Sequence, residues 1–334
     1  MIFINYKPIR LIELFAGIGS QAKALKNLGV NFEHWRVCEF DPHAIRSYNA
    51  VHGTNFTTSD ITEITAKDLA ISDTDSYTYF LTYSFPCQDL SPCGKGAGME
   101  KGSGTRSGLL WEVERLLDEC TELPQVLLME NVPQVHSPKN KEHFEQWIGF
   151  LESKGYSNHW KDLNAKDYGI PQNRNRCFMV SILGDYSFEF PKPMKLEKTF
   201  YSMWDREVNK KYYLSPDKVN RLLSIPKDKH GPTLLDKNSA YAKTLTTRIG
   251  SSGNFEQYIL EVVDDPTSMR RFTPRESWRF MGFDDADIEK ALTVCSDSQL
   301  YKQAGNSIVV NVLMEIFEEL FCRADEGLVE SWML

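Results

Sequence analysis

The stretch RLIELFAGIGSQAKALKNL, residues 10–28, decides the fold of this 334-residue chain. Residues 10–15 form an apolar run of the length expected for a buried β-strand, and residues 21–28 show the spacing of an amphipathic helix. Between them, Gly17 and Gly19 allow a tight turn and a close backbone approach to a ligand. The N-terminus of the following helix favours polar or anionic groups. The stretch therefore predicts a strand, a ligand-binding turn and a helix.

The same alternation continues to about residue 184. Further strands are predicted at residues 35–40, 79–85, 126–130 and 177–183, and further helices at residues 42–51, 108–120 and 141–154. This pattern predicts a Rossmann-like α/β fold, in which a mostly parallel sheet is covered by helices on both faces. Ligands of such sheets bind beyond the carboxyl ends of the strands.

The chain divides into three parts by pattern and charge. Residues 1–184 form the predicted catalytic and cofactor-binding domain, and residues 185–265 a smaller irregular domain rich in Pro, Lys and Tyr. Residues 185–250 hold 13 Lys and Arg against 8 Asp and Glu, a net of +5, so the rest of this chain of net charge −8 carries −13. We interpret this asymmetry as a basic module on an acidic body. Residues 266–334 return to helical patterning, with one apolar face that packs on the first domain: Ile308, Val309, Val312, Leu313, Ile316, Phe317 and Leu320.

Cysteine usage and the lack of targeting segments indicate a soluble cytoplasmic protein. The seven cysteines form no Cys-x-x-Cys pair, and the first residues lack the apolar core of a signal peptide. No apolar stretch reaches the roughly 18 to 20 residues needed to cross a bilayer. Cys87 and Cys93 have no second pair to complete a tetrahedral zinc site, so no metal is predicted.

Residues whose side chains could bind a ligand or take part in a reaction follow the predicted strands. Glu39 can accept from both hydroxyls of a ribose, and Phe40 can stack on a purine. Asp60 and Ile61 offer an acceptor for an exocyclic amine beside an apolar wall. Pro86-Cys87 and Glu130-Asn131 follow two later strands and bring a thiol and a carboxyl group to the same edge. The first of these positions fit a nucleoside ligand.

Two classes of enzyme fit the nucleoside site. Gly17-x-Gly19-x-x-Ala22, with Glu39 about 20 residues further on, satisfies the dinucleotide fingerprint of an NAD-dependent oxidoreductase. A dehydrogenase, however, has no use for a thiol and a carboxylic acid that face one pocket. This pair favours covalent catalysis at a nucleophilic cysteine.

Six motifs follow one another along the chain: LIELFAGIG (11–19), FPCQDLS (85–91), MENV (129–132), YGIPQNRNRCFMV (168–180), RRFTPRESWRFMGF (270–283) and YKQAGNSIVVNVL (301–313). In order, and at about the same spacing, they resemble the motifs of the DNA cytosine-5 methyltransferases of bacterial or phage restriction-modification systems. The resemblance covers nearly the whole chain except the basic middle region. The resemblance implies methyl transfer from S-adenosylmethionine to carbon 5 of a cytosine turned out of the duplex.

The resemblance also assigns catalytic residues. Cys87 matches the nucleophile that adds to carbon 6 of the ring, and Glu130 the acid that neutralises charge at ring nitrogen 3. Arg176 matches the residue that binds the cytosine carbonyl oxygen and orients the glutamate. Arg174, on the same side of a strand, is expected to support the flipped nucleotide or the nucleophile loop. We expect Asn131 to hold the glutamate loop.

A larger set matches family residues around S-adenosylmethionine. These residues are Phe15, Ala16, Gly17, Ile18, Gly19, Glu39, Phe40, Asp60, Ile61, Pro86 and Leu109, with Asn306 and Ser307 at the methionine end. The end of the chain is thus predicted to complete a pocket that its beginning opens.

Double-stranded DNA is the expected partner, bound by a monomer that acts beside a cognate restriction endonuclease without stable association. Residues 91–108 hold six glycines and three basic residues, which predicts a mobile loop that closes over DNA. Residues 185–265 become the target-recognition domain. The candidate DNA contacts are Gln88, Ser91, Lys95, Arg106, Thr244, Thr246, Thr247 and Arg248. The RNA-directed branch of the family remains an alternative, although Phe85 stands where that branch has proline.

Overall fold

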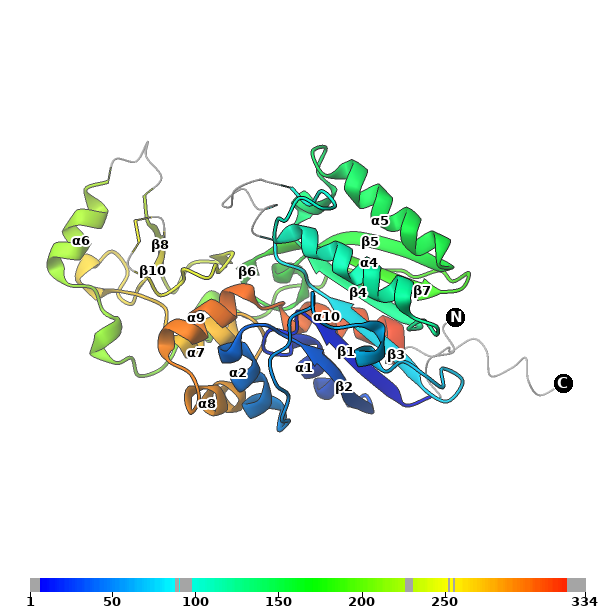
Figure 1. The fold of residues 1–334 in the computed structure, drawn as a ribbon. Helices are drawn as coiled ribbons and strands as arrows, with labels where there is room; N and C mark the ends of the chain where they lie inside the picture. Colours follow the sequence, from blue (N-terminus) through cyan, green and yellow to red (C-terminus); the bar gives the residue numbers. More distant parts are fainter. Residues whose placement is uncertain are drawn as a thin grey trace.

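The computed structural model describes residues 7–87, 90, 98–225, 231–251, 253–254 and 256–322. Its centre is a six-stranded sheet (Figure 1). Four strands run parallel, in the spatial order β2 (Phe32–Cys38), β1 (Ile9–Leu14), β3 (Thr78–Tyr83) and β4 (Val126–Asn131). Next to β4 lies the antiparallel β7 (Asn175–Leu183), and β5 (Tyr156–Asn164) pairs antiparallel with β7 at the edge. The predicted mostly parallel α/β sheet is confirmed.

The strand β5 was absent from the sequence prediction. Its sequence, YSNHWKDLN, lacks both an apolar run and a regular alternation, because β5 is an edge strand whose central residues are only partly buried. The sequence pattern also did not predict that β7 runs antiparallel to β4. The reversal matters because it brings the beginning of β7, and not its end, to the edge where the parallel strands finish.

Helices cover both faces of the sheet (Figure 1). Alternate side chains of β1 enter two separate cores: Ile9 and Leu11 pack on the side of α1 (Ser20–Asn27) and α10 (Val310–Phe317), while Ile12 and Leu14 pack on the opposite side. That opposite side is covered by α4 (Leu110–Glu119) and α5 (Lys141–Ser153). The other short elements of this part are α2 (Pro42–His52), α3 (Ala66–Leu69), η2 (Ser107–Leu109), η3 (Pro133–His136) and η4 (Ala165–Tyr168).

The middle of the chain forms a separate lobe in Figure 1. The lobe carries α6 (Pro216–Leu223), β8 (Thr233–Leu235) and β10 (Gln257–Leu260). The elements η5 (Phe200–Met203), η6 (Lys210–Tyr212) and β9 (Ala242–Lys243) contribute Phe200, Met203, Tyr212 and Ala242 to the main core. The strand β10 lies between β8 and β11 (Met269–Arg270) in a small sheet. Val219, Leu222, Tyr258 and Met269 form a small core of their own. A parallel pairing of β9 with β6 (Gln172–Asn173) joins the lobe to the segment that precedes β7.

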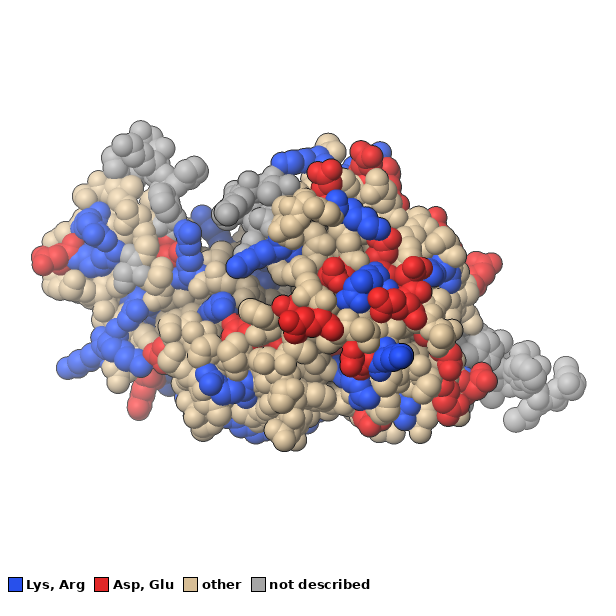
Figure 2. Space-filling view, in the orientation of Figure 1, with Lys and Arg blue, Asp and Glu red and all other residues tan. Residues whose placement is uncertain are grey.

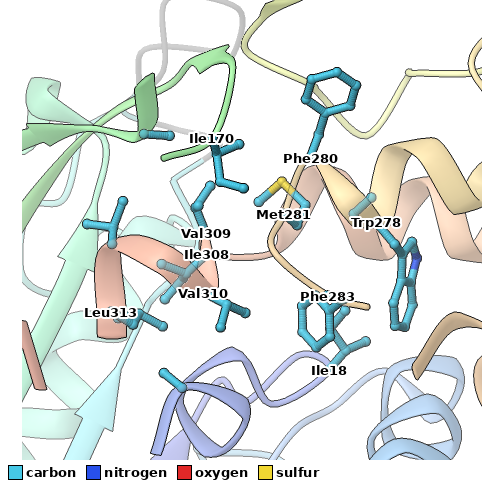
Figure 3. Close-up of a cluster of buried hydrophobic side chains, with 14 of the residues drawn as sticks. Ile18, Ile170, Trp278, Phe280, Met281, Phe283, Ile308, Val309, Val310 and Leu313 are labelled. Carbon is cyan, nitrogen blue, oxygen red and sulfur yellow. The ribbon is translucent and has the colours of Figure 1, made fainter. Parts of the chain in front are cut away.

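The last part of the chain returns to the central sheet through η7 (Pro266–Ser268), α7 (Pro274–Arg279), α8 (Asp285–Leu292), α9 (Asp297–Asn306), α10 and η8 (Glu318–Cys322). All seven residues of the predicted apolar face are buried. Figure 3 shows Ile308, Val309 and Val310 in one buried cluster with Phe283 and with Ile18 of the glycine turn. The two ends of the chain therefore share one core. None of the helices in the described ranges is both long and apolar enough to span a membrane.

The helix α9 lies directly against residues 244–250 of the middle lobe. A Cβ atom added to Gly305 would lie 2.2 Å from the backbone nitrogen of Thr247, and one added to Gly250 would lie 2.3 Å from the ring of Tyr301. No side chain fits in either place. Glycine is needed at these two positions for close approach of the backbone.

We predict that Gly305→Ala destabilises the protein. Alanine within a helix usually stabilises by about 0.5–1 kcal/mol relative to glycine, but at position 305 its methyl group meets backbone that cannot rotate away. We expect a loss of about 1–3 kcal/mol from overpacking, measured by urea denaturation. Gly149→Ala, at a glycine of α5 with no neighbour within 4 Å, is the matched control and should be neutral or stabilising. Equal stability of the two variants would refute this contact.

Candidate active site

The segment that carries Cys87 leaves the end of β3 and is held from two sides. The Oγ of Ser107 donates a hydrogen bond to the carbonyl of Pro86 at 2.7 Å. The Nδ2 of Asn131 donates to the carbonyl of Phe85 at 2.9 Å. The backbone just before the thiol is thus fixed, and Asn131 links it to the neighbouring strand. Sequence reasoning missed Ser107, because a single serine in a glycine-rich segment gives no signal.

Glu130 lies near the end of β4 and forms an ion pair with Arg176, which lies near the start of β7. The Nε of Arg176 is 3.2 Å from Oε1 of Glu130, and their side chains are only 15% and 10% exposed. The antiparallel pairing places Glu130 opposite Phe178, two residues beyond Arg176. Side chains two residues apart on a strand share a face, so the reversed β7 presents Arg176 to this carboxylate.

The charges of this pair act on Cys87. Burial raises the pKa of the Cys87 thiol, and the Glu130 carboxylate raises it further, while Arg176 and Arg174 lower it without reversing the shift. Burial likewise raises the pKa of Glu130, against the opposing effect of the two arginines. The protein without DNA therefore keeps Cys87 largely as a thiol at neutral pH, and its proton must leave before sulfur can act as a nucleophile.

Arg174 is buried and ties three parts of the chain together. Its Nη1 donates to the carbonyl of Leu245 at 2.8 Å, and its Nη2 donates to the carbonyls of Gly305 and Ser307 at 3.0 and 2.8 Å. Its charge still reaches Cys87 and Glu130. Gln172 has a related position: its amide donates to the carbonyl of Phe280 and accepts from the backbone N–H of Leu245. We expected Arg174 to support the flipped nucleotide or the nucleophile loop, whereas its hydrogen bonds go to the carbonyls of Leu245, Gly305 and Ser307.

Among the residues predicted to bind the cofactor, Glu39 is held directly against the glycine turn after β1. The carboxylate of Glu39 accepts from the backbone N–H of Gly17 at 2.8 Å and from that of Asp41 at 2.7 Å. The ring of Phe40 is 73% exposed, whereas Ile61 is buried. Asp60 accepts from the backbone and hydroxyl of Thr62.

The backbone of this turn is unusual. Phe15 has a φ of 58°, and Gly17 and Gly19 also have positive φ values. A non-glycine residue in the left-handed region costs of the order of 1–3 kcal/mol and typically marks a functional site. Ala16 and Ile18 are buried between these residues, while Pro86 and Leu109 are half-buried.

The far end of the chain reaches the same turn. The hydroxyl groups of Ser20 and Ser307 lie 2.9 Å apart in a buried hydrogen bond. Asn306, at the end of α9, is exposed. The structure thus joins Ser307, but not Asn306, to the start of α1, directly after the glycine turn.

The candidate DNA contacts are only partly described. Gln88, Ser91 and Lys95 lie outside the described residues. Arg106 is exposed, as are Thr246, Thr247 and Arg248, the last three in one turn after β9. Thr244 donates its hydroxyl to the carbonyl of Asn173, next to Arg174. Figure 2 shows several Lys and Arg side chains on the lobe that carries α6.

Comparison with known proteins decides the family. Residues 9–322 match the family described as C-5 cytosine-specific DNA methylase. The chain belongs to this family. It is a DNA cytosine-5 methyltransferase, which rules out the oxidoreductase interpretation of the glycine turn.

Relatives match the methylase over nearly its whole length. Type II methyltransferase M2.ScrFI of Lactococcus lactis subsp. cremoris is 33% identical, over 94% of this chain and 99% of the relative. Type II methyltransferase M.HhaI of Haemophilus parahaemolyticus is also 33% identical, over 92% and 93%. Among solved structures, the methyltransferase EhMeth of Entamoeba histolytica has a TM-score of 0.78 at 20% identity, covering 96% of this chain and 100% of that one. Dnmt2 of S. pombe has a TM-score of 0.76 at 21% identity, covering 93% and 97%. These two structures support the fold.

In this methylase, we predict that Glu130→Gln shifts alkylation of Cys87 by iodoacetamide to lower pH. The substitution removes a negative charge that raises the pKa of the thiol and leaves Arg176, which lowers it, without its partner. Arg176→Gln should shift the profile to higher pH. Mass spectrometry of the Cys87 peptide, with DNA absent, measures both. Unchanged pH profiles of Cys87 alkylation, or shifts of both variants in the same direction, would contradict these electrostatic effects.

Proposed function

We propose that the methylase transfers a methyl group from S-adenosylmethionine to carbon 5 of a cytosine turned out of a short specific sequence in duplex DNA, through covalent attachment to Cys87. The observation that carries this proposal is the position of Cys87 beside the buried pair of Glu130 and Arg176. A nucleophile, an acid and an orienting cation are the groups that this reaction needs.

The turn after β1 fits the methyl donor. The exposed ring of Phe40 offers a stacking face for adenine, and Glu39, anchored by two backbone N–H groups, keeps lone pairs for ribose hydroxyls. Asp60 and Ile61 would flank the adenine, and Ser307 would close the methionine end. When bound, S-adenosylmethionine supplies an electrophilic methyl group.

Sulfur addition makes carbon 5 reactive. The S–H bond of Cys87 breaks, a bond forms between sulfur and carbon 6, and the electron pair of the ring moves toward nitrogen 3. We infer that the thiol proton passes to Glu130, whose pKa is raised by burial, and from there to nitrogen 3. Net charge is then conserved, which suits a buried site that disfavours a free thiolate. Once carbon 5 carries the methyl group, its proton is lost to solvent, the electrons of that C–H bond re-form the ring double bond, and the bond between sulfur and carbon 6 breaks. The sulfur then regains the proton held at nitrogen 3, which restores the thiol.

The remaining residues position the base and the DNA. We assign Arg176 to the cytosine carbonyl oxygen and to Glu130, and Arg174 to bracing the segment that begins at Leu245. Residues 185–265 act as the target-recognition domain between the catalytic residues 1–184 and the returning segment 266–334. Thr246, Thr247 and Arg248, exposed in one turn, are the proposed contacts to DNA. The enzyme acts as a monomer beside a cognate restriction endonuclease.

We predict that duplex DNA containing 5-fluorocytosine in the target site traps the enzyme covalently once S-adenosylmethionine is added. Fluorine cannot leave as a proton does, so the sulfur–carbon bond persists. The measurement is a shifted band in denaturing electrophoresis, with the modified peptide identified by mass spectrometry. Bisulfite sequencing of DNA from cells that express the protein supplies the target sequence beforehand.

The controls separate the parts of this proposal. Cys87→Ala should form no adduct, and Cys120→Ser, at a partly buried thiol after α4, should form it normally. Adduct formation by Cys87→Ala would disprove the nucleophile assignment. Efficient methylation of transfer RNA, with none of duplex DNA, would support the RNA-directed branch instead.

A further inference from the structure

Three potential metal ligands converge on the side of the sheet that faces α5, outside the proposed catalytic residues. They are His136 of η3, Asp162 of β5 and Cys177 of β7, and their ligand atoms all lie within 4.8 Å of one another. The Nε2 of His136 is 3.0 Å from Oδ1 of Asp162. We propose that these residues bind a divalent metal ion of the zinc class. This site differs from the Cys87 and Cys93 pair considered in the sequence.

The sheet fixes two of the three ligands. Asp162 and Cys177 are direct partners in the nine-residue register between β5 and β7, so their side chains lie on the same face. The ring of His136 packs against Trp160, at a centroid distance of 4.7 Å, and lies 6.2 Å from the ring of Phe144, which itself contacts Trp160. The three ligands therefore come from separate elements that already hold them together.

The donor set suits a borderline-soft ion. Imidazole nitrogen, thiolate sulfur and carboxylate oxygen are the three ligand types of protein zinc sites. Bonds of about 2.0–2.3 Å in a tetrahedron place ligand atoms roughly 3.3–3.7 Å apart, so the present spacing needs adjustments of at most about an ångström. Cys177 is fully buried, while the side chains of His136 and Asp162 are 25% and 30% exposed. Solvent therefore reaches the side of the cluster formed by His136 and Asp162, from which an ion can enter.

Binding of the ion requires the thiol of Cys177 to lose its proton. On binding, the S–H bond of Cys177 breaks, a sulfur–metal bond forms, and the proton passes to solvent. The bound ion would join η3, which follows Glu130 closely in sequence, to the two strands β5 and β7.

The test is titration of the full-length protein with Co²⁺, without DNA or methyl donor. We expect one equivalent to produce a sulfur-to-cobalt charge-transfer band and the visible bands of a tetrahedral site. Cys177→Ser should abolish the charge-transfer band, and His136→Ala and Asp162→Asn should each weaken binding by at least about tenfold. Cys87→Ser and Cys120→Ser are the controls and should retain the band. Zn²⁺ should displace the cobalt and raise Tm in the wild type.

A band that persists in Cys177→Ser, or no band in the wild type at excess Co²⁺, would overturn the proposal. Circular dichroism checks the fold of each variant. If Cys177→Ser is misfolded, His136→Ala and Asp162→Asn decide, and unchanged binding in both would also overturn it. These readouts are independent of methyl transfer, so the proposed function can fail while the metal site stands.

Discussion

The ion pair between Arg176 and Glu130 depends on the direction of one strand. Because β7 runs antiparallel to β4, its beginning lies where β4 ends, and Arg176 meets Glu130 at 3.2 Å within a largely buried site. A parallel strand would carry the same arginine to the opposite edge of the sheet. A buried carboxylate without a cation would also be costly. The reversal thus makes a buried acid beside Cys87 possible.

A second constraint joins the two ends of the chain. The buried hydrogen bond between Ser20 and Ser307 connects the glycine turn to the returning segment, and Arg174 connects that segment to Leu245. Gly305 and Gly250 allow the close packing that these contacts need. The glycine turn of the proposed cofactor site, the proposed DNA-contact turn at residues 246–248 and the sheet edge with the proposed catalytic residues are therefore packed together. A residue such as Arg174 can affect all three without touching a substrate.

The sequence predicted local features better than long-range ones. The first strand, the glycine turn and α1 followed from apolar spacing and glycine chemistry, and the motif resemblance placed Cys87, Glu130 and Arg176 in one site. The strand β5 was missed because an edge strand with polar, half-exposed residues has no clear pattern. The bracing by Arg174 and Ser107 was missed because both act through backbone carbonyls distant in sequence, whose positions no local pattern encodes.

The most direct test of this account is a double-mutant cycle on Glu130 and Arg176 in single-turnover methyl transfer. If the two side chains act as one unit, either glutamine substitution alone removes most of the rate that the pair contributes. The double variant should then be little slower than the slower single variant. If the losses of the two single variants, expressed as activation free energies, add up to the loss of the double variant, Glu130 and Arg176 act independently. That result would contradict the account.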